Sequence, residues 1–184
     1  VCFLDRVAKN LRLYPSGLIH HALTLGPPAA DWLRRAKRTV QRVLREKRLV
    51  SDAAAMRHKA VGYHAFNLYA FALLQQSLPA HPFWKTEQMS RALAYVRTEA
   101  FANGLEKNRY GYPYNPAGLE VALALHTFCE DARDEQEHWV SEQLRRTYDY
   151  HSHMLARNTE DPVTLSARLY EATRLPNLDV RVPD

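Results

Sequence analysis

The feature that most constrains the fold of this chain is an internal repeat marked by its three tryptophans. Trp32, Trp84 and Trp139 lie 52 and 55 residues apart, and the second and third open similar stretches in which Glu-Gln follows three residues later. A repeat of about fifty residues with two helices per unit is typical of stacked helical hairpins, because each hairpin buries its apolar face only against its neighbours. The sequence therefore predicts repeated helical hairpins, with the tryptophans packed in the helices that they open.

Hydrophobic residues recur at helical spacing through nearly the whole chain, whereas Pro and Gly cluster between the periodic stretches. We expect helices over residues 2–13, 16–25, 29–48, 52–77, 83–102, 116–129, 133–156 and 161–174. No stretch alternates as a half-buried strand would, so the predicted class is all-α. We expect residues 1–184 to form a single helical domain of about three to four hairpins.

Two types of helix alternate along the chain. Helices near the tryptophans have one charged face, whereas the stretches 63–74, 115–126 and 161–170 are apolar over most of their surface. A helix that is apolar on all sides belongs inside a protein, and an amphipathic helix belongs outside. We therefore predict two layers of hairpins, as in a partial or complete (α/α) toroid, with an open superhelix as the alternative.

The net charge of +5 is concentrated in one segment. Residues 29–48 carry eight basic side chains against two acidic ones. The spacing of its apolar residues predicts an amphipathic helix. The basic residues would then lie on its outer face, where they are either solvated or bound to an anionic partner. This excess of basic residues does not recur in the Trp84 and Trp139 helices, where acidic and basic residues nearly balance. An RNA-binding repeat needs such recurrence, so we expect no nucleic-acid partner.

Several other classes of protein find no support in the sequence. There is no run of eighteen apolar residues, and four of the first fifteen residues are charged, so we expect neither a membrane span nor a signal peptide. Cys2 and Cys129 stand alone, and glycine-rich nucleotide motifs do not occur, so we predict no metal site and no cofactor. The chain begins at Val1 instead of Met, which indicates a processed chain or part of a longer one.

Polar and aromatic residues gather just before each of the three apolar stretches. In a two-layer helical ring the inner helices begin at one rim, so these segments should surround a central cavity. Tyrosine rings can cover the apolar face of a pyranose while amide, guanidinium and carboxylate groups bind its hydroxyls. The predicted substrate-binding residues are Arg57, Tyr63, Asn67, Tyr112, Tyr114 and Asn115. For the tyrosines of the loop, packing within a proline-rich segment is the alternative.

Two titratable residues in the apolar stretches are the candidates for catalysis. Glu120 lies within the stretch 115–126, where burial raises the pKa of a carboxyl towards the range that a general acid or base needs. The alternative for Glu120 is a buried pair with Arg57 or Arg109. His64 is a candidate proton-transfer group near neutral pH, with a hydrogen-bonded core histidine as the alternative.

With its alternating amphipathic and apolar helices and its aromatic, polar rim, the segment 29–174 resembles the (α/α) toroid carbohydrate-active enzymes. These are the N-acylglucosamine 2-epimerase-like proteins, the six-hairpin glycosidases and the toroid polysaccharide lyases. The resemblance is one of architecture, and no catalytic motif of these families is matched. It implies an epimerase, lyase or glycosidase that acts on a sugar or a uronic-acid-containing saccharide by general acid or base chemistry.

Toroids of this kind usually need about six hairpins to close. The chain is therefore part of a longer toroid, or completes its ring with a further protein chain, or stays open. A non-catalytic helical-repeat scaffold that binds a protein partner is the alternative function. A scaffold would pair the polar groups of the rim with one another, whereas an enzyme would leave several of them facing an open pocket.

Overall fold

The computed structural model describes residues 3–21 and 46–182, with side chains from residue 53 onward in the second range. The α-helices are α1 (Phe3–Asn10), α3 (Glu46–Ser77), α4 (Glu87–Val96), α5 (Glu99–Glu106), α6 (Ala117–Phe128), α7 (Arg133–Thr147) and α8 (Pro162–Ala167). Two 3-10 helices, η1 (Pro82–Lys85) and η2 (Arg168–Arg174), and a short antiparallel hairpin of β1 (Tyr148–Asp149) and β2 (Met154–Leu155) complete the list. The predicted all-α class is confirmed.

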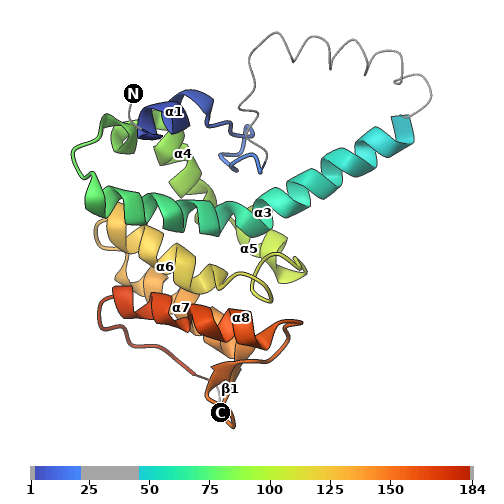
Figure 1. The fold of residues 1–184 in the computed structure, drawn as a ribbon, viewed down its shortest axis with the longest axis vertical. Coiled ribbons are helices and arrows are strands. Elements are labelled where there is room, and N and C mark those ends of the chain that lie inside the picture. Colours follow the sequence, from blue (N-terminus) through green and yellow to red (C-terminus); the bar gives the residue numbers. More distant parts are fainter. Residues whose placement is uncertain (1–2, 22–45, 183–184) are drawn as a thin grey trace.

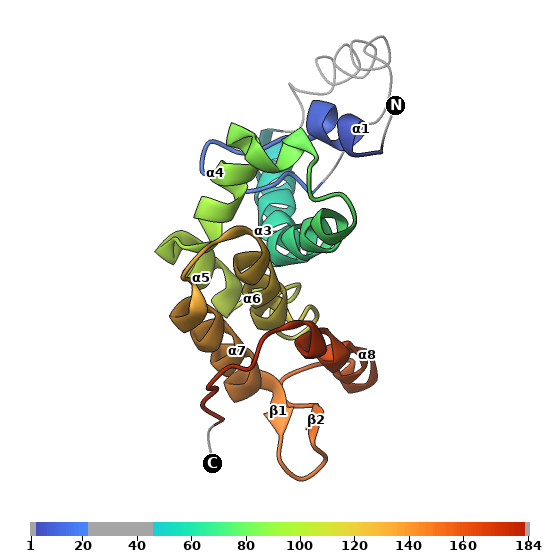
Figure 2. The ribbon, with the colours of Figure 1, turned by 90° about the vertical axis from the view of Figure 1, so that its left-hand side faces the viewer.

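The helices form two layers. In Figure 1, α3, α6 and α8 follow one another down the molecule, and Figure 2 shows α4, α5 and α7 on the other side of them. Helix α6 packs against α3 and α7 and also touches η2. The layer of α3, α6 and α8 contains the three stretches that are apolar on most sides. The one in α6 is buried from Ala117 to Leu125, but in α8 only Leu165 is buried, so the burial expected for the stretch 161–170 is not found. In the described ranges the layers form a row and do not close into a ring.

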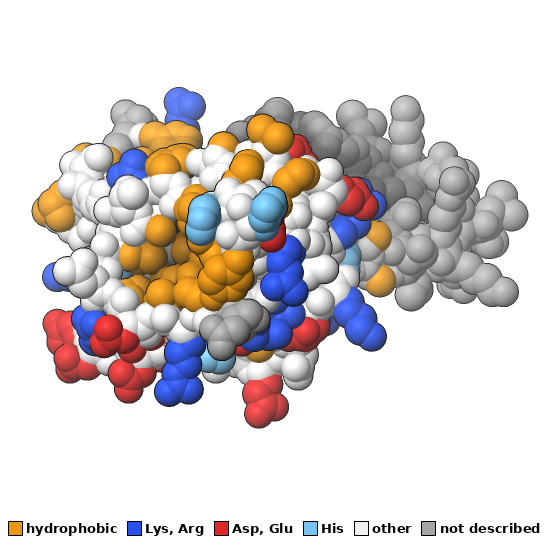
Figure 3. All heavy atoms as spheres, turned by 90° about the horizontal axis from the view of Figure 1, so that it is seen from below, with side chains coloured by type: hydrophobic (Ala, Val, Ile, Leu, Met, Phe, Trp, Pro, Cys, Tyr) orange, Lys and Arg blue, Asp and Glu red, His pale blue; other side chains and the backbone are white. Residues whose placement is uncertain are grey.

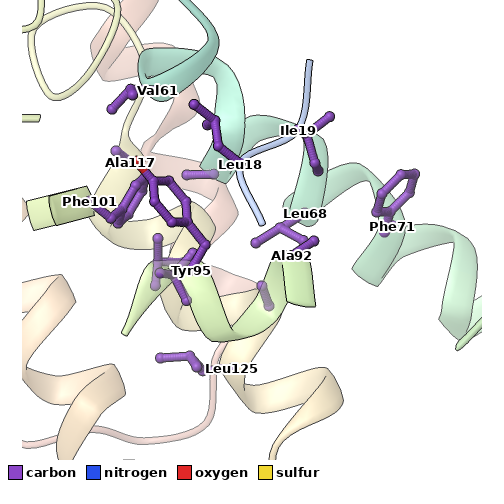
Figure 4. Close-up of a cluster of buried hydrophobic side chains, with 14 of the residues drawn as sticks. Leu18, Ile19, Val61, Leu68, Phe71, Ala92, Tyr95, Phe101, Ala117 and Leu125 are labelled. Carbon is purple, nitrogen blue, oxygen red and sulfur yellow. The ribbon is translucent and has the colours of Figure 1, made fainter. Parts of the chain in front are cut away.

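One hydrophobic core joins the N-terminal segment to both layers, as Figure 4 shows. Leu18 and Leu68 are fully buried there, beside Tyr95 of α4 and Phe101 of α5. Burial of each large side chain of this kind stabilises the fold by about 1.5–3 kcal/mol. The core lies between α3, α4, α5 and α6, and it fixes the middle of α3 relative to the start of α6.

Two glycines let backbone segments approach closely. A Cβ atom at Gly118 of α6 would overlap the carbonyl oxygen of Trp139 in α7. A Cβ atom at Gly62 of α3 would overlap Tyr110 of the loop between α5 and α6. These two contacts set the spacing of α6 and α7 and seat the α5–α6 loop directly on α3.

The N-terminal part of the chain agrees only partly with the helix prediction. Residues 2–13 contain α1, but the predicted helix 16–25 is wrong over its described part. There the chain makes a turn closed by an isolated bridge between Leu13 and Ile19. Gly17 has a φ of 94°, which an α-helix does not allow. The predicted helix 29–48 lies outside the described residues except for its last three, which begin α3.

The later segments are helical but more interrupted than predicted. Residues 83–102 divide into η1, α4 and α5 because Thr86 and Thr98 each cap a new helix, accepting hydrogen bonds from the backbone N–H of Met89 and Phe101. Helix α7 ends at Thr147, where the β-hairpin replaces the predicted continuation to residue 156. The segment 161–174 is α8 followed by η2.

The tryptophans of the repeat pack between helices. Trp139 of α7 is buried against Phe101 of α5, with ring centroids 5.7 Å apart. Trp84 of η1 contacts Phe128 at the end of α6, with centroids 5.7 Å apart. The predicted packing role is confirmed for these two, and Trp32 lies outside the described residues.

Candidate functional site

A pocket of about 660 Å³ lies where three distant segments of the chain meet. The segments are the middle of α3, the loop between α5 and α6, and the residues that lead into α8. The lining residues are Tyr63, Arg109, Tyr110, Pro113, Tyr114, Asn158, Thr159, Glu160, Asp161 and Thr164. In Figure 1 the α5–α6 loop and the start of α8 lie at the same side of the molecule. Residues from the three segments that precede or open the apolar stretches therefore line one pocket.

Three tyrosine rings form one wall of this pocket. The centroid of the Tyr63 ring lies 5.7 Å from that of Tyr110 and 6.2 Å from that of Tyr114, and the Tyr110 and Tyr114 centroids are 6.4 Å apart. Aromatic rings attract one another at these separations. Tyr114 is 52% exposed, whereas Tyr63 and Tyr110 are half-buried. Tyr114 is thus the ring with the most open surface for a ligand.

Cations hold the two inner rings. The ammonium of Lys59 lies 5.7 Å from the Tyr63 centroid and 5.6 Å from the Tyr110 centroid. The guanidinium of Arg109 lies 5.0 Å from the Tyr110 centroid. A cation this close to a ring is attracted to its electron-rich face. Lys59 and Arg109 therefore fix these rings and make this side of the pocket positive.

The hydroxyl of Tyr63 on this wall remains protonated at neutral pH. Burial, and then the neighbouring Tyr114 hydroxyl, raise the pKa of Tyr63 above its ordinary value. A protonated phenol both donates and accepts a hydrogen bond, which suits the hydroxyl groups of a polar ligand.

Two buried asparagines fix the α5–α6 loop. Asn108 Nδ2 donates to the carbonyl of His58 at 2.7 Å, and its Oδ1 accepts from the backbone N–H of Tyr110 at 3.0 Å. Asn115 Nδ2 donates to the carbonyls of Gly62 at 3.2 Å and Tyr110 at 2.6 Å. Asn115, a predicted substrate-binding residue, lies behind the pocket and positions the loop that carries Tyr114.

The segment before α8 forms the third wall. Thr159 Oγ1 donates to the carbonyl of Pro113 at 2.6 Å, which ties this segment to the α5–α6 loop. Asp161 caps α8 by accepting a hydrogen bond from the backbone N–H of Thr164 at 3.0 Å. Glu160 is exposed at the pocket, so this wall presents carboxylate oxygens opposite in charge to Lys59 and Arg109.

Glu120 is fully buried and pairs with Arg168 of η2. Its Oε1 lies 2.5 Å from Nη2 of Arg168. The same guanidinium donates from Nε to Glu171 at 2.7 Å and from Nη1 to Oδ1 of Asn115 at 3.0 Å. The alternative of a buried, hydrogen-bonded pair for Glu120 is therefore correct in kind, but the partner is Arg168, and the predicted partners Arg57 and Arg109 are wrong.

This cluster holds two buried carboxyl groups for one guanidinium. Burial raises the pKa of Glu120 to about 8 although Arg168 lowers it, and burial also raises the pKa of Glu171. Among the described atoms, neither Oε2 of Glu120 nor Oε2 of Glu171 has a hydrogen-bond partner. Arg168 can balance one negative charge, so Glu120 keeps its proton at neutral pH.

His64 is also fully buried, but its hydrogen bonds are complete. Its Nδ1 accepts from the backbone N–H of Ile19 at 3.2 Å, so its Nε2 carries the proton and donates to the carbonyl of Ala92 at 3.0 Å. Burial lowers the pKa of His64 to about 4. The ring joins the N-terminal segment to α4 and stands apart from the pocket-lining residues, so this arrangement lends no support to proton transfer by His64.

The remaining predicted residues, Arg57, Asn67 and Tyr112, are not among those that line this pocket. The exposed Arg57 places its guanidinium 5.9 Å from the Tyr14 centroid. Asn67 is half-buried one turn along α3 from Tyr63. Tyr112 is buried, with the guanidinium of Arg146 4.5 Å from its ring centroid.

Most of the lining residues were not among the predicted ones. They come from the same two segments, 108–116 and 157–161, whose polar and aromatic composition marks them in the sequence. What the sequence did not reveal is which side chain of each segment faces inward, since loops have no fixed period.

Two kinds of feature are missing from the part of the chain that the structure describes. No group of three or more His, Cys, Asp or Glu side chains there is arranged to hold a metal ion. None of the helices in those ranges is both long enough and apolar enough to cross a membrane.

Comparison with known proteins gives one informative relative. The chain is 36% identical, over an alignment of 184 residues, to a Haloferax volcanii protein named archaeal glycosylation protein Q. The alignment covers 97% of this chain and 50% of the relative, so the chain spans about half the length of that protein. No family model matches the sequence, and no solved structure matches it. The likeness connects the chain to a protein named for glycosylation.

Proposed function

We propose that this chain is a carbohydrate-active domain that acts in glycosylation and takes a sugar or a uronic-acid-containing saccharide into the pocket beside Tyr114. The observation that carries this proposal is the exposed Tyr114 ring, placed next to cationic, amide and carboxylate side chains in one pocket. An open aromatic face suits the apolar face of a pyranose, and the surrounding polar groups suit its hydroxyls. The name of the Haloferax relative supports the same direction.

The arrangement of the helices supports a second element of the proposal, that the chain is part of an (α/α) toroid. Helices α3, α6 and α8 form one layer and α4, α5 and α7 the other (Figure 2). The pocket lies where α6 and α8 begin, which is where the inner helices of such a ring place their binding groups. Further hairpins, from a longer chain or a partner, would close the ring.

Glu120 is the proposed general acid or base. It keeps its proton near neutral pH, and through Arg168 it is linked to Asn115, the neighbour of Tyr114. A protonated carboxyl acts as a general acid: Glu120 would give its proton to the saccharide, and only the carboxylate left behind could then take a proton as a base. Glu120 is buried and does not itself line the pocket, so the proposal requires the saccharide to come within reach of it. The test is Glu120→Gln assayed for saccharide turnover by NMR, with circular dichroism as the check on folding. Lost turnover in a folded variant supports the assignment, and full turnover contradicts it.

The binding proposal is tested with Tyr114→Ala. We expect mono- and oligosaccharides, uronic acids included, to raise the melting temperature of the wild type at millimolar concentration, as any ligand of the folded state does. Removal of the open ring should weaken binding about tenfold in calorimetry. Tyr170→Ala is the matched control, because Tyr170 is similarly exposed at 56% and does not line the pocket.

Two results would contradict the binding proposal. The first is a folded wild type that no saccharide stabilises. The second is equal weakening by Tyr114→Ala and Tyr170→Ala, which would show that binding does not depend on the pocket.

A scaffold that binds a protein partner is the second candidate, and the lower face of the molecule favours it. Figure 3 shows hydrophobic side chains gathered in a hollow of this face, with histidine and basic side chains beside it. In the C-terminal part of the described residues, the large exposed hydrophobic side chains are Tyr150, Met154, Val163 and Tyr170. Light scattering after gel filtration tests this candidate. Self-association that Val163→Asp abolishes would favour it, and a monomer at all concentrations would count against self-association.

A further inference from the structure

A second, smaller hollow adjoins the pocket beside Tyr114. It has a volume of about 180 Å³. Its lining residues are Glu106, Tyr112, Pro113, Arg146, Thr147 and Asn158. Pro113 and Asn158 also line the larger pocket. Pro113 and Asn158 therefore form the border between the two hollows.

The junction between the hollows is held by hydrogen bonds from several elements. Thr159 Oγ1 donates to the carbonyl of Pro113, and Asn158 Nδ2 donates to the carbonyl of Arg146 in α7 at 2.8 Å. The Asn158 backbone has a φ of 53°, a conformation that asparagine tolerates better than most residues. The position of this junction is thus set by the α5–α6 loop, α7 and the segment before α8 together.

The smaller hollow offers polar groups where the larger one offers an open ring. The Arg146 guanidinium covers the buried Tyr112 ring and pairs with Glu106 at 2.6 Å and with Glu142 at 3.0 Å. The Glu106 side chain is 52% exposed, so its carboxylate oxygens remain accessible to solvent. Carboxylate and guanidinium groups bind sugar hydroxyls by charge-assisted hydrogen bonds.

We propose that the two hollows form one groove that binds an oligosaccharide of at least two rings. One ring lies against Tyr114, and the next passes Pro113 and Asn158 into the hollow lined by Glu106 and Arg146. The combined space falls within the range of small-molecule binding sites, about 300–1,000 Å³. This inference rests on the proposed function and names the ligand class, a saccharide chain instead of a monosaccharide.

The test is calorimetric titration with two series of saccharides, malto-oligosaccharides and oligogalacturonides, each of one to four rings. In the series that binds, affinity should rise about tenfold or more between one ring and two or three, and then level off when the groove is filled. If saccharides of a series bind but their affinity does not depend on their length, the proposal of one continuous groove is wrong, while the proposal of saccharide binding stands. Failure of every member to bind overturns both proposals.

The variant Glu106→Ala tests whether the second sugar ring binds in the smaller hollow. We expect this variant to lose most of the gain in affinity from one ring to three, about fivefold or more, while single-ring affinity stays within about twofold of the wild type. Glu135→Ala is the matched control. Glu135 is also an exposed carboxylate that pairs with an arginine through both oxygens, Arg97 at 2.8 Å, but it lines neither hollow. If Glu106→Ala gains as much affinity from one sugar ring to three as the wild type does, the smaller hollow is not the site of the second ring.

Asn158→Gly tests the junction independently. Glycine accepts the φ of 53°, so the backbone is kept while the side-chain amide and its hydrogen bond to Arg146 are removed. We expect weaker binding of two- and three-ring saccharides. Asp131→Gly is the control, since Asp131 has the same φ of 53° and lines neither hollow. Equal binding by both variants would show that the chain does not pass this junction.

Discussion

His64 and Glu120 are both completely buried titratable residues on neighbouring apolar helices, yet their surroundings differ. His64 of α3 uses both ring nitrogens, one with the backbone of Ile19 and one with Ala92. Glu120 of α6 uses one oxygen, with Arg168, and leaves the other without a partner among the described atoms. Buried polar groups are almost always hydrogen-bonded, so the incomplete group is the one that calls for an explanation. Unused hydrogen-bonding capacity distinguishes a candidate functional carboxyl from a structural histidine better than burial does.

The two residues also respond to pH in opposite directions. Burial favours the neutral form of each, which lowers the pKa of His64 to about 4 and raises that of Glu120 to about 8. The His64 contribution to stability is lost as the pH falls from 6.5 towards 4. The Glu120 contribution is full below its unfolded pKa of 4.5 and is lost as the pH rises towards 8.

The largest expected effect is that of Arg168→Met. This change leaves the carboxyls of Glu120 and Glu171 without their shared cation, and we expect a loss of about 3–5 kcal/mol in the free energy of unfolding at pH 8. The loss should be smaller at pH 5, where Glu120 is protonated. Urea denaturation at both pH values measures it. Arg97→Met, which removes an exposed pair with Glu135, is the control and should cost no more than about 1 kcal/mol. Equal losses in the two variants would contradict the buried cluster.

The titration of His64 comes next in size. Between pH 6.5 and 4 the unfolded chain binds a proton on His64 and the folded chain does not. This difference lowers the free energy of unfolding by about 3 kcal/mol. His64→Gln should lack this part of the slope and be less stable at pH 7, because the Ile19 and Ala92 groups lose their partners. The measurement is the free energy of unfolding of His64→Gln across this pH range. The control is His138→Gln, because His138 is an exposed histidine of α7. If the stability of His64→Gln depends on pH as steeply as that of the wild type, the assignment of a neutral, buried His64 ring is wrong.

Glu120→Gln should change stability less and in the opposite sense. Glutamine carries no charge, so we expect a difference within about 1 kcal/mol at pH 5 and a variant about 1–3 kcal/mol more stable than the wild type at pH 9. The measurement is the free energy of unfolding as a function of pH. A variant that is less stable than the wild type at pH 9 would show that the ionised pair with Arg168 stabilises the fold.

The smallest effect is expected at Gln136, a buried residue of α7 whose Oε1 has no partner among the described atoms. Gln136→Met should change the free energy of unfolding by less than about 1 kcal/mol, or stabilise the fold. Gln143, two turns along the same helix, bonds to Gly118, Thr147 and the carbonyl of Tyr112. Gln143→Met should therefore cost clearly more in the same denaturation experiment. A reversed order would refute the rule drawn from His64 and Glu120.

Much of the fold was predictable because it depends on local spacing. The period of the apolar residues indicated helices over most of the described chain, and it identified α6 as a buried helix, but it wrongly indicated burial of the stretch 161–170. The interruptions were harder to see. Thr86 and Thr98 lie within one continuous apolar pattern, and their capping hydrogen bonds outweigh its continuation. The turn at Gly17 similarly overrides the pattern of residues 16–25.

The candidate site was predictable in part. Composition pointed to the segments that meet at the pocket, and it selected Tyr63 and Tyr114, which line it. It also selected Asn115, Tyr112 and His64, which the structure uses to hold other parts of the chain. A polar residue looks the same in a sequence whether its hydrogen bonds are made within the protein or left for a ligand.

The sequence by itself determined the helical class, the alternation of two helix types and the burial of Glu120, because these depend on the spacing of apolar residues along a single helix. Only the tertiary structure decided which groups meet: Arg168 reaches Glu120 across 48 positions, and the Tyr114 loop meets the segment before α8 across 44. Charge balance and open space depend on atoms that the packing of helices brings together. No local pattern in the chain records those distances.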